Sequence, residues 1–209
     1  WSSDVCSFDL DVDYYSDGYL AVDLRVLDVL ETEKRIVVNR AFGEVLVSGK
    51  VTLYKKIKFF THENVGWGDI HLPEQQMHTC AYWMSLPREK FMSVTRDKLQ
   101  SALLGVANLL QNIVPLELMC DPRDIRVFPQ VKSPFTEEPT IYLYESYPGG
   151  VGFSEKLFLL HDRLLEKVAD ALAGCTCLLG CPSCVGPIEE VGKAGKSNAR
   201  WLLREITED

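Results

Sequence analysis

The sequence lacks several features that would assign it to a class at once. No apolar run approaches the roughly 20 residues that a membrane-spanning helix needs, so we expect no membrane span. Internal repeats and low-complexity linkers are absent, which excludes a solenoid and a string of tethered modules. Only 4 histidines occur, and no His-x3-His or His-Glu-x2-His pattern joins them, which excludes a metal catalyst built on such a motif.

An excess of positive charge is also lacking. The net charge of −8 argues against a protein that coats nucleic acid indiscriminately. The charge is uneven along the chain: residues 1–49 carry 4 basic and 10 acidic side chains, whereas residues 50–100 carry 8 basic and 5 acidic ones. The second segment can form a local basic surface, although an ordinary mixed surface explains the same composition.

Four of the 7 cysteines lie close together, in the run Cys-Thr-Cys-Leu-Leu-Gly-Cys-Pro-Ser-Cys. Four thiolates are the ligand set of a structural, tetrahedral zinc site, and a Cys-x2-Cys turn lets two sulfurs face one ion. An iron–sulfur cluster or a redox dithiol could use the same thiols, so both remain open alternatives. The expected zinc ligands are Cys175, Cys177, Cys181 and Cys184.

The remaining cysteines are Cys6, Cys80 and Cys120, which are scattered among apolar residues. We expect them to be plain buried thiols. An odd number of cysteines does not suit a disulfide framework, so cysteine usage indicates a reducing, cytoplasmic compartment.

Hydrophobic patterning predicts strands early in the chain and helices later. Residues 18–60 are typical of strands, with a turn signal at 48–50. A polar loop over 61–69 then precedes a short strand at 70–72, and residues 141–144 are typical of a buried strand. Apolar residues at helical spacing predict helices over 95–115, 154–173 and 197–208.

These elements predict an α+β fold, in which a mixed sheet packs with two or three long helices beside a four-cysteine zinc knuckle. The 209 residues, of which 46% are hydrophobic, suffice for one sizeable core. We therefore expect a single domain over residues 1–209. Its expected parts are a mainly β region (1–90), an α+β region (91–174), a zinc-binding loop (175–187) and a C-terminal helix (188–209).

A glycine-rich turn, Tyr-Pro-Gly-Gly-Val-Gly, lies between a predicted strand and a predicted helix. It is not a Walker A motif, because no Gly-Lys-Ser/Thr follows at the required spacing. One interpretation is a tight turn that packs the helix close to the strand. The other is a phosphate contact from the exposed backbone N–H groups of Gly149, Gly150 and Gly152.

Further candidates for contact with nucleic acid lie elsewhere in the chain. Trp67 is flanked by glycines in a predicted loop and could stack on an unpaired base. Lys193, Lys196 and Arg200 surround the start of the last helix and could contact phosphates, although a solvated face explains them equally well. His161 falls on an apolar helix face, where we expect a hydrogen-bonded core histidine.

Two motifs, read together, resemble one protein family. The run Tyr-Glu-Ser-Tyr-Pro-Gly-Gly-Val-Gly from Tyr144 to Gly152 is followed by a predicted helix and by Cys-x-Cys-x3-Cys-Pro-Ser-Cys-Val-Gly-Pro. This arrangement resembles the C-terminal zinc-binding (MZB) domain of the mitomycin repair factor A (MrfA) family of DNA helicases. The resemblance extends over about residues 20–190; one departure is Glu145, where Asp is expected.

The resemblance implies a function. Full chains of this family carry two RecA-like ATPase domains, translocate 3′ to 5′ on DNA and repair mitomycin-type damage. This chain has neither a Walker A nor an Asp-Glu-x-His motif, so ATP and Mg²⁺ would bind only in a helicase core outside it. The chain would be an accessory domain with structural zinc that guides or separates strands for the motor.

The same resemblance implies the partners: the helicase core of the same polypeptide, and single-stranded or forked DNA. We expect a monomer without membrane contact in the cytoplasm, associated with the nucleoid if the source is bacterial. Two other functions remain open: a zinc-stabilised protein-interaction module without nucleic-acid contact, and a redox or iron–sulfur sensor.

Overall fold

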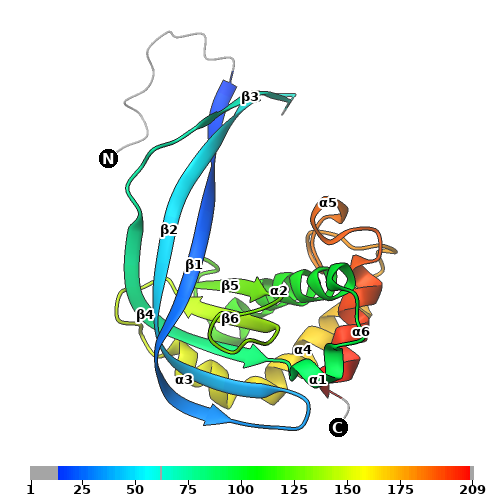
Figure 1. Ribbon diagram of the computed structural model, residues 1–209. Coiled ribbons are helices and arrows are strands. Elements are labelled where there is room, and N and C mark those ends of the chain that lie inside the picture. Colours follow the sequence, from blue (N-terminus) through cyan, green and yellow to red (C-terminus); the bar gives the residue numbers. More distant parts are fainter. Residues whose placement is uncertain (1–13, 62, 208–209) are drawn as a thin grey trace. The chain divides into compact units, whose positions relative to one another are not determined.

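Two compact units share two long strands. The computed structural model describes residues 14–61 and 63–207 (Figure 1), so Cys6 lies outside the described residues. Strands β1 (Tyr14–Glu33) and β2 (Asn39–Lys58) each contribute to both units. The smaller unit ends at residue 24 on β1 and resumes over 47–76; the larger unit contains residues 25–46 and those from 77 onward.

The smaller unit is built from strands. In it, β3 (Asn64–Asp69) pairs antiparallel with β2, and Lys55 lies opposite Trp67. The predicted turn at 48–50 is wrong, because β2 continues through it as extended backbone. The predicted loop over 61–69 and strand at 70–72 are also misplaced, since cross-strand hydrogen bonding begins at Asn64.

The sheet runs in the order β1-β2-β4-β6-β5, with β3 paired to β2. Its remaining strands are β4 (Gln75–Ser85), β5 (Ile125–Gln130) and β6 (Thr140–Glu145). Strand β6 pairs antiparallel with β4 and with β5, and all of its residues are buried. The predicted strand at 141–144 and the α+β class are therefore confirmed, whereas β5 was not predicted.

Helices follow the strands in the larger unit. The two longest are α2 (Arg96–Leu118) and α4 (His161–Gly174). Helix α6 (Gly195–Thr207) confirms the predicted C-terminal helix. The short helices are α1 (Arg88–Phe91), α3 (Phe153–Leu159) and α5 (Ile188–Val191).

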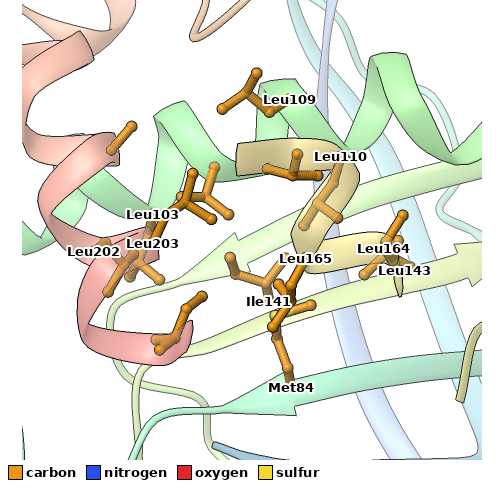
Figure 2. Packing of buried hydrophobic residues seen from close by; sticks show 14 of the residues in the cluster. Met84, Leu103, Leu109, Leu110, Ile141, Leu143, Leu164, Leu165, Leu202 and Leu203 are labelled. Carbon is orange, nitrogen blue, oxygen red and sulfur yellow. The ribbon is translucent and has the colours of Figure 1, made fainter. Parts of the chain in front are cut away.

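The hydrophobic core of the larger unit lies where α2, α4 and α6 meet β4 and β6. Figure 2 shows leucines of all three helices converging on the sheet. The labelled side chains are Leu103, Leu109 and Leu110 of α2, Leu164 and Leu165 of α4, Leu202 and Leu203 of α6, and Met84, Ile141 and Leu143 of the strands. Burial of this apolar surface is the main force that holds the helices on the sheet.

Two helix boundaries differ from the prediction. Helix α2 does not stop at Pro115 but includes it and ends at Leu118; the next residue, Met119, caps the helix with a left-handed φ of 56°. Proline removes one N–H from the helix, but burial of Pro115 and Leu118 holds the last turn in place. The helix predicted over 154–173 is divided at Leu160 into α3 and α4.

By length and composition alone, α2 could cross a membrane. More than half of its most apolar stretch is buried inside the protein, and α2 packs on α6, α4 and β5. A long apolar helix surrounded by its own chain is typical of a protein core.

Candidate metal centre

The four clustered cysteines meet at one point. Their sulfur atoms all lie within 4.8 Å of one another, and four of the separations are 3.4, 3.5, 3.5 and 3.7 Å. A disulfide needs about 2.05 Å, so these are separate thiols. Zinc–sulfur bonds of about 2.3 Å at tetrahedral angles place the sulfurs about 3.8 Å apart. The arrangement therefore fits one tetrahedral ion.

The end of a helix and one backbone turn bring the sulfurs together. Helix α4 ends at Gly174, and Cys175 continues in extended backbone. At the other half, the Cys184 N–H and the Gly186 N–H donate to the carbonyl oxygen of Cys181, at 2.9 and 3.1 Å. Gly186 has a φ of 99°, and a Cβ there would lie 2.3 Å from the Asn108 amide, so only glycine fits.

Helix α2 holds the metal-binding loop and the following α5 in place through hydrogen bonds. The Asn108 amide donates to the carbonyl oxygen of Val185 at 2.9 Å, and the Ser101 hydroxyl donates to that of Val191 at 2.6 Å. Cys184 and Val185 are buried in the core. In Figure 1 the loop, coloured orange, accordingly lies beside α2 and α6.

The thiols differ in acidity. A hydrogen bond from the Cys177 backbone N–H, together with the neighbouring thiols, lowers the pKa of Cys175 to about 7. Burial raises the pKa of Cys184. A coordinated thiol is deprotonated, so binding of zinc here releases protons and weakens on acidification.

Lys196 lies under the loop and is buried, with 6% of its surface exposed. Its ammonium donates to the carbonyl oxygens of Cys175 and Cys177, at 2.7 and 2.5 Å, and lies 3.4 Å from the Cys177 sulfur. The prediction that Lys196 contacts phosphates is therefore wrong, because the ammonium is directed into the protein.

The glycine turn already holds an anion, the carboxylate of Glu145. This buried side chain accepts hydrogen bonds from the Val151 N–H (2.5 Å), the Ser154 N–H (2.8 Å) and the Ser154 hydroxyl (2.7 Å) at the start of α3. The N–H groups of Gly149 and Gly150 donate to the carbonyl oxygens of His78 and Tyr147.

An internal carboxylate in this position repels a phosphate. The N–H groups of Gly149 and Gly150 are taken up by internal contacts, which favours a structural turn, and the phosphate contact predicted for Gly152 stays a prediction. Gly150 has a φ of 72°, and a Cβ there would lie 2.9 Å from Cys80, so glycine is required for close packing.

The other predicted contacts are exposed. Trp67 lies on β3, not in a loop, and 70% of its surface is exposed. Lys193 and Arg200 are exposed before and within α6. These three positions are not tested further by the structure and stay predictions.

His161 is confirmed as a hydrogen-bonded core residue. Its Nδ1 contacts the hydroxyl of buried Tyr82, and burial lowers the pKa of His161 to about 4. Cys80 and Cys120 are half-buried, not fully buried as expected, and burial raises the pKa of each thiol.

Comparison with known proteins agrees with this geometry. Residues 106–185, which include all four clustered cysteines, match the family described as "MrfA Zn-binding domain". The chain belongs to this family. It therefore carries a Zn-binding domain with a four-cysteine cluster.

Two similar sequences cover different shares of the chain. The "Uncharacterized ATP-dependent helicase YprA" of Bacillus subtilis (strain 168) is 41% identical over 198 residues, which are 95% of this chain and 26% of the helicase. The "Uncharacterized protein MJ1572.1" of Methanocaldococcus jannaschii is 30% identical over 76 residues, 35% of this chain and 68% of that protein.

Solved structures of the DUF1998 helicase MrfA share the fold. The structure of that helicase bound to DNA matches with a TM-score of 0.75 and 40% identity, over 94% of this chain and 26% of the helicase chain. The structure bound to DNA and AMPPNP matches with a TM-score of 0.60 and 37% identity, over 92% and 23%. The chain thus spans about a quarter of the length of the helicases that it matches.

Proposed function

We propose that this chain is the zinc-stabilised accessory region of an ATP-dependent 3′–5′ DNA helicase that acts in DNA repair. In this proposal the rest of the helicase supplies ATP hydrolysis, and the region guides or separates DNA strands for the motor. The observation that carries the proposal is the four-sulfur cluster, which lies inside the stretch that matches the MrfA Zn-binding domain. Identity of 41% to a helicase supports the same assignment.

Cys175, Cys177, Cys181 and Cys184 would hold one zinc ion. Zinc with four protein sulfurs has no open position for water or substrate, so its contribution there is structural. The ion would join the end of α4 to the loop that packs on α2 and α6. Zinc binding is thereby linked to the folding of this part of the core.

Exposed side chains are available for DNA. A similar helicase has been solved bound to DNA, which supports DNA as the partner. On the smaller unit, Phe60 and Trp67 are 98% and 70% exposed and could stack on unpaired bases. On the larger unit, the exposed side chains Lys193 and Arg200 could contact phosphates.

The test uses the complete helicase that contains this chain. Replacing Cys181 and Cys184 together by serine is expected to abolish zinc binding and to slow the unwinding of forked DNA, while basal ATP hydrolysis is retained. Metal analysis, unwinding and ATPase assays measure the three effects. Undiminished unwinding by the zinc-free variant would refute an accessory role of the zinc region.

A further inference from the structure

The side chain of Lys196 is placed where its three donors meet three acceptors. An ammonium group has three N–H bonds and no acceptor capacity. Two of its neighbours are the carbonyl oxygens of Cys175 and Cys177, and the third is the Cys177 sulfur. The contacts thus converge on the Cys-x-Cys half of the cluster.

The charge of this group matters because it is buried. Zinc with four thiolates is a doubly negative centre, and burial of uncompensated charge is costly. The Lys196 ammonium brings a positive charge to within 3.4 Å of one of the four sulfurs. The two charges therefore stabilise each other, and neither is favourable alone in this position.

The backbone at Lys196 is fastened to the same loop. Its N–H donates to the carbonyl oxygen of Leu179 at 3.2 Å, between the two halves of the cysteine cluster. Gly195 packs so closely that a Cβ there would lie 2.4 Å from Val191. The first turn of α6 is therefore joined to the metal loop by both side-chain and backbone contacts.

We propose that Lys196 is the internal counter-ion of the zinc–thiolate centre and couples zinc binding to the docking of α6. The residue positions the Cys175 and Cys177 carbonyls and offsets the charge of the thiolates. The inference rests on the proposed zinc ligands.

The experiment compares two single-charge changes in α6 and the residues before it. Lys196→Gln removes the buried charge, and Lys193→Gln removes an exposed one three residues earlier. Competition with a chromophoric chelator measures zinc affinity. We expect zinc binding to weaken by about 10- to 100-fold in K196Q, as is usual when a partner of a metal ligand is lost. Unchanged affinity in K196Q, or equal loss in K193Q, would overturn the proposal.

A second measurement separates this role from plain structural packing. The rise in melting temperature on adding zinc should be smaller in K196Q than in the parent protein. If Lys196 has a packing role alone, the substitution lowers the melting temperatures of the zinc-free and the zinc-bound protein equally. If K196Q does not fold, hydrogen exchange of the parent protein decides: zinc removal should speed exchange at the Lys196 amide more than in β6. Equal changes in both places would overturn the coupling.

The outcomes distinguish this inference from the zinc assignment. A parent protein that binds no zinc refutes the four-cysteine site, and the inference with it. A parent that binds one zinc ion while K196Q binds zinc equally well refutes only the role of Lys196.

Discussion

Glu145 and Lys196 show how single charged side chains are used inside this protein. Each is buried: the Glu145 carboxylate accepts hydrogen bonds from backbone N–H groups, and the Lys196 ammonium donates hydrogen bonds to backbone carbonyl oxygens. Glu145 is the last residue of β6, and its carboxylate lies at the start of α3, where a helix favours a negative charge. Both residues therefore serve the structure, although the sequence suggested a phosphate contact for Lys196.

Removing the charge of Glu145 should destabilise the fold. In Glu145→Gln, an amide group faces N–H donors that it cannot satisfy in the same way, so we expect a loss of about 1–3 kcal/mol in the free energy of unfolding. Urea denaturation measures the change. Glu155→Gln, on the exposed side of α3, is the matched control and should change stability little. Equal stability of the two variants would contradict the role assigned to the buried carboxylate.

At the scale of elements, the loop between α4 and α5 is held by its converging cysteines as well as by the packing of Val185 in the core. Its residues include exposed Leu178 and Leu179, while its cysteines converge inside. A short loop of this kind gains its stability from the bound metal.

Loss of one ligand should loosen the loop and α6. Cys181→Ala is expected to reduce zinc content below one ion per chain and to lower the melting temperature, since three sulfurs leave the tetrahedral site incomplete. Metal analysis and thermal unfolding provide the two readouts. Cys120 is half-buried and lies outside the cluster, so the Cys120→Ala variant should retain one zinc ion per chain. An unchanged melting temperature in Cys181→Ala would contradict a structural metal.

The β2–β3 hairpin is the element that we expect to bind unpaired DNA. Trp67→Ala should weaken binding of a single-stranded oligonucleotide by roughly fivefold or more, because stacking on an aromatic ring contributes about 1–3 kcal/mol per base. Fluorescence anisotropy over a salt series measures the affinity. Trp67→Phe keeps an aromatic ring and should retain most of the binding. If the Trp67→Ala variant binds the oligonucleotide as tightly as the parent protein does, Trp67 has no part in DNA contact.

At the scale of the whole molecule, the buried pair of Tyr82 and His161 makes stability depend on pH. The pKa of His161 is about 4 because of burial and the nearby Arg40, below the 6.5 of an exposed histidine. Between these values the unfolded chain binds a proton that the folded chain does not. Stability is therefore lost as the pH falls from about 6.5 to about 4, by at most about 3 kcal/mol.

His161→Gln should remove this part of the pH dependence. The free energy of unfolding, measured by denaturant titration at pH 7 and pH 5, is expected to fall less in this variant than in the parent protein. His71→Gln, at an exposed position, should behave like the parent. The assignment fails if the His161 variant loses as much stability on acidification as the parent does.

The amino-acid sequence by itself determined what depends on neighbours in the chain. The cysteine spacing predicted the cluster, because a chelating loop needs only residues close in sequence, and apolar periodicity predicted α2 and α6. Tertiary structure alone decided that Pro115 stays in a helix, that Trp67 lies on a paired strand, and that Glu145 and Lys196 are buried. Those outcomes depend on contacts between residues far apart in the chain: Lys196 faces a loop that begins 21 residues earlier. Charge and exposure therefore had to be read from the folded chain, whereas the metal ligands could be read from their spacing.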